Sequence, residues 1–198
     1  MKGKRFLISF LGTFSTGKTT LVKALREELK RYGSVEVIYG GTRLVRNHGI
    51  RISEEAGVLD QAVLTLCTVE RLLSAYADFI LVDEHLLLHL AYGEALGFDV
   101  WFLRKLKSLS DTVYRNFYER GFLVLNFLLP LIPLQETKFR SKDVGFRLEV
   151  QKNLEMLVVK DRFGFYEIAG SYSKGNKSEA VADRVSQVLS LILACQVK

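Results

Sequence analysis

Short segments rich in apolar residues alternate along the chain with longer segments in which apolar residues recur at helical spacing. The short segments, each of strand length, are residues 6–11, 35–39, 79–82, 122–128 and 163–169. The longer segments are residues 19–29, 57–77, 85–96, 100–120, 143–160 and 176–194. In residues 57–77 the helical spacing is kept by Leu59, Val63, Leu66, Val69, Leu72, Leu73 and Tyr76. Such alternation predicts an α/β fold, a three-layer α/β/α sandwich with a mainly parallel sheet that binds ligands at the carboxyl ends of its strands.

The length and composition suit one compact domain over residues 1–198. Of the 198 residues 48% are hydrophobic, which is enough for a sizeable core. The longest apolar run, residues 121–134, is interrupted by Asn126 and two prolines and is too short to cross a bilayer. The basic start of the chain has the charge of a signal peptide, but the apolar residues after it run straight into a glycine-rich loop. We therefore expect a cytoplasmic protein without a membrane span.

The net charge of +6, with a pI near 9.3, suits either a nucleic-acid-binding protein or an enzyme whose substrates carry several phosphates. The basic residues are scattered over the predicted helices, and the chain carries no signature of a nucleic-acid-binding module. This distribution favours small phosphorylated substrates over a polynucleotide. Cys67 and Cys195 lie in apolar helical patterns far apart in the sequence, so we expect buried free thiols rather than a disulfide or a zinc site.

The segment from Gly12 to Thr19, GTFSTGKT, fits the phosphate-binding pattern G-x-x-x-x-G-K-[ST] and lies between a predicted strand and a predicted helix. Its glycines let consecutive backbone N–H groups turn toward one anion, expected to be a β-phosphate. Lys18 would reach the β- and γ-phosphates, and the Thr19 hydroxyl would bind Mg²⁺. The expected nucleotide-binding residues are Gly12, Ser15, Thr16, Gly17, Lys18, Thr19 and Thr20. The motif therefore predicts a nucleoside triphosphate, with ATP as the expected cofactor.

Asp83 and Glu84 directly follow the predicted strand over residues 79–82. In a parallel sheet Asp83 would lie beside the phosphate-binding loop, within reach of the metal ion and its waters; the alternative is a helix cap. Glu84 could orient an attacking water, polarise an acceptor hydroxyl, or simply be solvated at a helix start. His85 and His89 are spaced by one helical turn, but the leucines around them favour packing over metal binding.

Two groups of basic residues could bind anionic parts of the substrates. Arg43 and Arg46 follow the second predicted strand, where they could clamp an acceptor or be solvated. Arg140 and Arg147, with Lys138 and Lys142, flank a helix start that Ser141 or Asp143 could cap. We expect residues 133–147 to form a lid whose two arginines stabilise a transferring phosphoryl group and have little structural role; a charged helix end is the alternative. The loop over residues 170–176 is either an adenine-binding edge or a polar turn.

These motifs resemble the compact P-loop kinase-like family that includes the nicotinamide riboside kinase domain, with nucleoside and nucleoside monophosphate kinases as more distant relatives. Similar members carry G-x-x-S-[ST]-G-K-[ST]-T-L, present here as residues 12–21, and an arginine after the second strand, present as Arg43. They also carry a lid R-S-x-D-x-x-x-R, present as residues 140–147, and Gly-Ser after the last strand, present as residues 170–171. The resemblance implies the P-loop NTPase fold of kinase type. The chain departs from the family in having Asp-Glu, rather than Asp-Arg, after the third strand.

The sequence as a whole favours an ATP- and Mg²⁺-dependent phosphotransferase acting on a small nucleoside- or nucleotide-like acceptor. In this interpretation Lys18, Asp83, Glu84, Arg140 and Arg147 are the expected catalytic residues, and Arg43 and Arg46 bind the acceptor. The first alternative is an NTP-hydrolysing or regulatory NTP-binding protein in which Glu84 activates water. A polynucleotide 5′-kinase is the second. The identity of the acceptor, the preference for ATP over GTP and the oligomeric state do not follow from the sequence.

Overall fold

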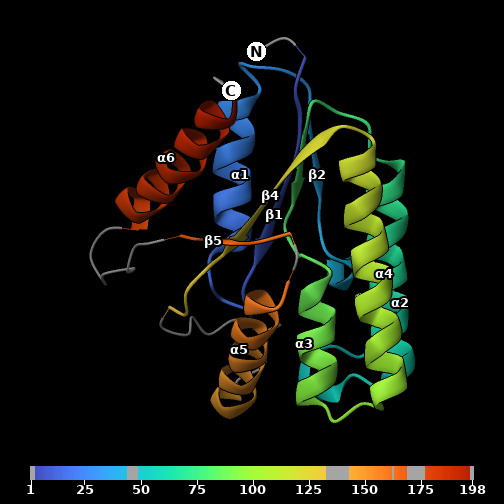
Figure 1. Ribbon diagram of the computed structural model, residues 1–198. Helices are drawn as coiled ribbons and strands as arrows, with labels where there is room; N and C mark the ends of the chain where they lie inside the picture. Colours follow the sequence, from blue (N-terminus) through green and yellow to red (C-terminus); the bar gives the residue numbers. More distant parts are fainter. Residues whose placement is uncertain (1–2, 44–48, 133–142, 162, 169–176, 197–198) are drawn as a thin grey trace.

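The computed structural model is built around a five-stranded sheet in which each strand is parallel to its neighbours (Figure 1). The structure describes residues 3–43, 49–132, 143–161, 163–168 and 177–196. The strands are β1 (Arg5–Leu11), β2 (Val35–Ile38), β3 (Phe79–Val82), β4 (Phe122–Leu128) and β5 (Tyr166–Glu167), in the spatial order β2-β3-β1-β4-β5. The predicted α/β fold with a parallel sheet is thus confirmed.

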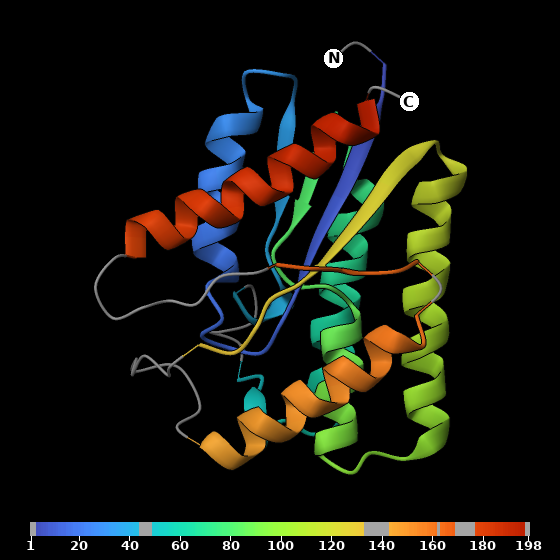
Figure 2. The ribbon, with the colours of Figure 1, turned by 60° about the vertical axis from the view of Figure 1, so that its left-hand side comes forward.

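Helices cover both faces of this sheet, and two more lie beyond the carboxyl ends of the strands (Figure 2). One face packs against α1 (Lys18–Leu29) and α6 (Lys177–Gln196), and the other against α2 (Val58–Ser74) and α4 (Val100–Glu119). Beyond the strand ends, α3 (Leu87–Ala95) packs against α5 (Val144–Val159). The short 3₁₀ helices η1 (Gly41–Arg43) and η2 (Ser53–Glu55) lie between β2 and α2. None of the helices in the described ranges has the length and apolar content of a membrane span.

The central strand β1 sets the position of the loop that follows it. Its residues alternate between the two cores, so that Phe6 faces α1 and α6 whereas Leu7 faces α2 and α4. The Phe6 ring stacks on Phe79 of β3 at a centroid distance of 5.5 Å. β1 pairs with β4 along its whole length, up to Leu11 opposite Leu128. The neighbouring strands therefore hold β1 rigidly at the point where the phosphate-binding motif begins.

Some element boundaries differ from the sequence-based expectation. The last strand is β5, with two residues instead of seven, because a turn at Asp161 accepts hydrogen bonds from the backbone N–H groups of Phe163 and Gly164. The third helix begins at Leu87 rather than at His85, because the His85 backbone N–H donates to the Phe10 carbonyl at 3.1 Å. Cys67 and Cys195 are free, as expected, but they are only partly buried.

Helix α2 forms where predicted, but only part of the expected apolar face turns inward. Of the residues whose spacing predicted it, Val69 and Leu72 are buried, whereas Leu59, Val63, Leu66, Leu73 and Tyr76 are exposed. Its buried face also contains polar residues that find hydrogen-bond partners. Gln61 pairs with His89 Nδ1 at 2.6 Å, and the Thr68 hydroxyl accepts a bond from the Gly41 N–H at 3.0 Å. These contacts fix the rotation of α2, because a buried polar group is stable only when it is hydrogen-bonded.

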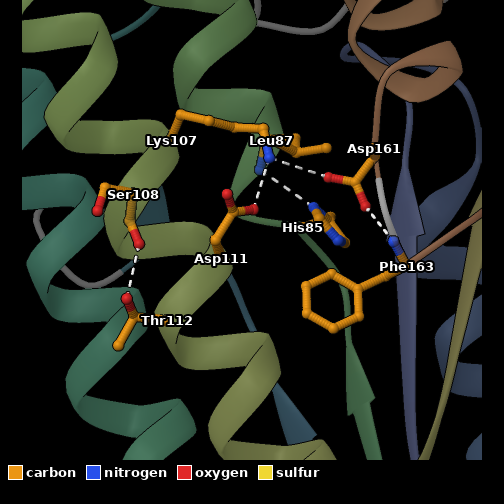
Figure 3. Close-up of polar contacts among 8 residues, drawn as sticks. All are labelled: His85, Leu87, Lys107, Ser108, Asp111, Thr112, Asp161 and Phe163. Carbon is orange, nitrogen blue, oxygen red and sulfur yellow. Dashed lines mark hydrogen bonds and ion pairs between the residues drawn. The ribbon is translucent and has the colours of Figure 1, made fainter.

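The residue that follows Asp83 and Glu84 is a core residue. The His85 ring stacks on Tyr114 of α4 at 4.2 Å, and its Nδ1 accepts a bond from the Leu87 N–H at 3.0 Å. Nearby, Lys107 of α4 contacts Asp111 at 2.5 Å and Asp161 at 3.3 Å, and thereby joins α4 to the segment before β5 (Figure 3). Burial, aided by the positive charge of Lys107, lowers the pKa of His85 to about 3. Burial likewise lowers the pKa of His89 to about 4.

These two neutral histidines predict that the protein loses stability as the pH falls from 7 to 5. The unfolded chain binds protons at histidine below about pH 6.5, whereas the folded chain binds them only near pH 4 and below. Each histidine should therefore lower the free energy of unfolding by up to about 1.4 kcal/mol per pH unit in this window. We expect His85→Phe, which keeps an aromatic ring against Tyr114, to reduce the slope by about one histidine's share. Urea unfolding at pH 7, 6 and 5 measures it.

The test compares how steeply the free energy of unfolding changes with pH in each variant, and not its absolute value. His85→Phe leaves the Leu87 N–H without its acceptor, and that loss lowers stability equally at each pH. His89→Asn serves as a second variant, and the double variant should have the shallowest pH dependence. An unchanged slope in all three variants would show that neither histidine is kept neutral by the fold.

Candidate active site

The loop of residues 12–17 joins β1 to α1 at the carboxyl edge of the sheet, where the predicted phosphate-binding motif should lie. Gly17 precedes the first turn of α1 with φ 87°, a left-handed conformation that glycine adopts without strain. A Cβ at Gly12 would lie 2.9 Å from the Thr16 hydroxyl and 3.3 Å from the Leu129 carbonyl. Ser15 also has a positive φ, 62°. The glycines of the motif are therefore needed for the compact curve of this loop.

Lys18 and Thr19, the first residues of α1, both make hydrogen bonds that prepare them for a nucleotide. Lys18 Nζ donates to the carbonyls of Gly12 at 2.6 Å and Thr13 at 2.7 Å, so its side chain folds back over the loop. The Thr19 hydroxyl donates to Asp83 Oδ2 at 2.7 Å. Asp83 thus lies beside the loop as predicted, and it does not cap α3, whose N-cap is Leu86. Of the other motif residues, Thr16 is buried and Thr20 is exposed on α1.

Two arginines from distant parts of the chain bind the same loop. Arg147 of α5 donates from Nε to the Phe14 carbonyl at 3.2 Å and to the Thr13 hydroxyl at 3.3 Å, and from Nη2 to the Ile132 carbonyl at 2.8 Å. Arg184 of α6 donates from Nη1 to the Thr16 carbonyl at 2.9 Å. Together with Lys18, these residues place three cationic side chains on the backbone of the loop.

The burial of Arg147 corrects the expectation that its structural role is small. Its exposed fraction is 6%, so it is neither a surface residue nor part of a separate charged helix end. The predicted cap of its helix is confirmed, since Asp143 accepts a bond from the Phe146 N–H at 2.9 Å. The rest of the predicted lid, including Arg140, lies outside the described residues, as does the loop over residues 170–176.

Arg184 is a residue that the sequence-based interpretation missed. It is fully buried, and it lies on the face of α6 that carries Val181, Val185 and Val188 into the core. An arginine inside an apolar stripe is the available signal, because a buried guanidinium requires hydrogen-bond acceptors. The sequence cannot identify the acceptor, a backbone carbonyl 168 residues away.

The Glu84 side chain lies beside Gly40, just after the end of β2. It is partly buried, and a Cβ added at Gly40 would overlap its carboxylate. At the next residue, a Cβ on Gly41 would overlap the Leu64 carbonyl of α2. This pair of glycines therefore lets Glu84 and α2 approach the segment that begins η1. Arg43 ends η1, and Arg46 lies outside the described residues.

The oxygens of Thr19 and Asp83 are the strongest candidates for metal ligands among the described residues. A hydroxyl and a carboxylate oxygen 2.7 Å apart provide the hard oxygen ligands that Mg²⁺ prefers. Magnesium usually keeps several waters and takes its remaining ligands from substrate phosphates, so two protein groups suffice. Nowhere in the described ranges do three or more His, Cys, Asp or Glu side chains form a metal-binding group.

Comparisons with known proteins agree with this geometry at the level of the fold. No protein-family model and no curated protein sequence matches the chain. Among solved structures, it is similar to thymidylate kinase from Ehrlichia chaffeensis, with a TM-score of 0.64 and 17% identity over 96% of this chain and all of that one. It is also similar to NadR in complex with NR, with a TM-score of 0.64 and 17% identity over 94% of this chain and 49% of that one.

A second NadR structure, in complex with NAD and AMP-PNP, matches with a TM-score of 0.58 and 16% identity over 92% of this chain and 48% of that one. The chain therefore spans about half the length of NadR and the full length of the thymidylate kinase. Both kinds of neighbour are P-loop kinases. At these identities the likeness concerns the fold, and it agrees with the resemblance seen in the sequence motifs. The chain has the α/β fold of the P-loop kinases.

Proposed function

We propose that this protein is an ATP- and Mg²⁺-dependent kinase that phosphorylates a small nucleoside- or nucleotide-like acceptor. The observation that carries the proposal is the 2.7 Å hydrogen bond between Thr19 and Asp83, next to a Lys18 side chain already held over the loop. This arrangement joins the loop residue and the strand-end carboxylate that serve together in phosphoryl transfer by P-loop enzymes. The kinase fold of the solved neighbours supports it.

In the proposed reaction the loop residues bind and orient ATP. Lys18 exchanges the Gly12 and Thr13 carbonyls for the β- and γ-phosphate oxygens, and backbone N–H groups from Ser15 to Thr19 surround the β-phosphate. Thr19 and Asp83 would hold Mg²⁺, which supplies positive charge against the phosphates when it is bound. Arg140 is proposed to meet the transferring phosphoryl group, whereas Arg147 acts through the loop that it holds.

The acceptor is proposed to bind on the side of Glu84, near the end of β2. Glu84 lies against Gly40, three residues before Arg43, so a hydroxyl placed there could donate to its carboxylate. The acceptor oxygen then forms a bond to the γ-phosphorus as the bond to the bridging β–γ oxygen breaks, and ADP leaves. Arg43 and Arg46 are proposed to bind anionic parts of the acceptor. The solved neighbours, a thymidylate kinase and NadR in complex with NR, support a nucleoside- or nucleotide-like molecule.

Hydrolysis of ATP is a second candidate function, and the sequence of the strand end favours it. Glu84 directly follows Asp83, where it could orient a water instead of an acceptor hydroxyl. The position of the Glu84 side chain against Gly40, beside the proposed acceptor site, supports binding of an acceptor hydroxyl over activation of a water. Both functions share the loop and differ in what Glu84 contacts.

Replacing Lys18 should abolish turnover without unfolding the protein. Lys18→Ala removes a charge that the reaction uses on the phosphates, while Arg147 and Arg184 still hold the loop through the Phe14 and Thr16 carbonyls. We expect kcat to fall on the order of 10²-fold or more. Lys23→Ala, at an exposed position on the same helix, is the matched control. Steady-state ATP turnover with circular dichroism measures both effects, and full activity in Lys18→Ala would refute the proposal.

Arg147 should contribute to both stability and ATP binding, because it ties α5 to the phosphate-binding loop. Arg147→Ala leaves the Phe14 and Ile132 carbonyls without their donor, which should cost about 2 kcal/mol and lower Tm by about 4–8 °C. A loosened loop should also raise KM for ATP. Arg147→Lys keeps the charge but lacks the guanidinium, whose Nε and Nη2 bind separate acceptors. Its Tm and KM should therefore lie between those of the wild type and Arg147→Ala.

The exposed Lys152 of the same helix provides the control, Lys152→Ala, which should change neither Tm nor KM. Differential scanning fluorimetry and ATP titrations measure the two quantities. A normal Tm together with a lowered kcat in Arg147→Ala would restore the lid role that the sequence suggested.

Glu84→Gln separates transfer from hydrolysis. A kinase excludes water until its acceptor is bound, so ATP consumption without acceptor should be slow, and Glu84→Gln should lower acceptor-dependent transfer more than background hydrolysis. In a hydrolase, the same variant would abolish rapid phosphate release with no acceptor present. Candidate acceptors are the nucleosides and nucleotides that raise the Tm of the protein in the presence of AMP-PNP. Phosphate release is then measured with and without these candidates. Glu54→Gln, at an exposed glutamate, is the control. Fast acceptor-independent release that depends on Glu84 would promote the hydrolase.

A further inference from the structure

The outward face of α2 carries an apolar stripe that no described part of the chain covers. It consists of Leu59, Val63, Leu66 and Leu73, extended at its ends by Val58 and Tyr76, with exposed fractions of 81%, 37%, 58%, 49%, 41% and 81%. We name these six residues the α2 stripe. The four central residues are spaced by four, three and seven positions, which is the spacing of a helix that packs along another helix. Helix α2 lies at the outside of its layer, beside α4 (Figure 1).

The α2 stripe is larger than the scattered apolar residues that a monomer normally exposes. Six side chains of this size and exposure present about 500 Å² of apolar surface, near the upper end for a typical monomer. The helix cannot hide them by rotating, because the bonds of Gln61 to His89 and of Gly41 to Thr68 hold its polar face inward. Since nothing in the described ranges buries the stripe, a second molecule is the occupant that we consider.

We propose that the α2 stripe is the interface of a two-fold symmetric homodimer, in which α2 packs antiparallel against α2 of a second copy. The stripe is complementary to itself under such a rotation. With Leu66 on the two-fold axis, Leu59 of one copy meets Leu73 of the other, and Leu66 meets its own counterpart. Each of the three leucines of the central stripe then faces a leucine of the other copy.

The one charged residue inside the stripe determines the direction of the packing. Glu70 occupies the position between Leu66 and Leu73 in the repeating pattern. In a parallel pair it would face the Glu70 of the partner, and like charges there destabilise the contact. In the antiparallel pair it lies opposite Ala62, whose short side chain leaves room for the carboxylate to reach water.

The charges around the α2 stripe disfavour a membrane as its occupant. Glu54 and Glu55 are exposed just before α2, and Glu70 is exposed within it. Arg51 is engaged by Asp60 at 3.0 Å, and Arg71 donates to the Tyr39 carbonyl at 3.4 Å. An anionic bilayer attracts helices whose apolar face is flanked by lysine and arginine, not by glutamate.

A specific dimer needs about 800 Å² per partner, which the stripe and its polar rim together can supply.

The oligomeric state in solution tests the interface. We expect sedimentation velocity to give twice the chain mass of 22.5 kDa at micromolar concentration for the wild type. Leu66→Glu places a charge on the two-fold axis and should weaken association on the order of 100-fold or more, while the CD spectrum stays unchanged because Leu66 is exposed. Trp101→Glu is the matched control, since Trp101 on α4 is 66% exposed but lies outside the stripe; it should remain dimeric.

Cross-linking tests the antiparallel arrangement directly. In the Cys195→Ser background, the native Cys67 lies next to Leu66, so a short bismaleimide should join two copies through Cys67. In a background without either cysteine, a mixture of Leu59→Cys and Leu73→Cys should form a mixed disulfide, and neither variant alone should form one. A monomeric wild type at 100-fold higher concentration, a dimer insensitive to Leu66→Glu, self-linking of Leu59→Cys, or binding of wild type but not Leu66→Glu to phosphatidylserine vesicles would each overturn the proposal.

Discussion

The curvature of the phosphate-binding loop is the constraint on which the rest of the structure depends. A loop that turns successive N–H groups toward one anion sends its carbonyls the other way, and buried carbonyls need donors. Here the donors are cationic: Lys18 binds the Gly12 and Thr13 carbonyls, Arg147 binds Phe14, and Arg184 binds Thr16. These contacts attach α1, α5 and α6 to one loop, so helices far apart in the sequence together stabilise its conformation.

The end of β3 organises the other side of the site through three successive residues with different directions. Asp83 bonds to Thr19 on α1, Glu84 lies against Gly40 after β2, and His85 stacks on Tyr114 in the core. Because His85 is buried, it holds the chain in place after β3. The carboxylates of Asp83 and Glu84, which precede it, therefore have fixed positions. The proposed metal-binding carboxylate and the proposed acceptor-binding one therefore belong to adjacent residues directly after β3.

The sequence predicted the features that depend on local pattern and missed those that depend on partners. Apolar runs and the motif at residues 12–19 located β1, β3, β4 and the loop, because buried strands and glycine turns are encoded within a few residues. The polar residues on the inward face of α2 and the burial of Arg147 and Arg184 were not predicted. In each case the deciding partner, such as His89 for Gln61 or Thr16 for Arg184, is remote in the sequence.

Helix α2 shows how a requirement of the site can shape a surface far from it. Its inner face must satisfy polar groups near Gly41 and His89, so Gln61, Thr65 and Thr68 occupy positions that a core helix normally gives to leucine. Leu59, Leu66 and Leu73 lie on the outer face, where no described part of the chain buries them. Pairing of two copies through the α2 stripe would stabilise the same helix that abuts Gly41 and, through it, the segment beside Glu84. The homodimer and the arrangement of the site would then both follow from the polar residues on the inner face of α2.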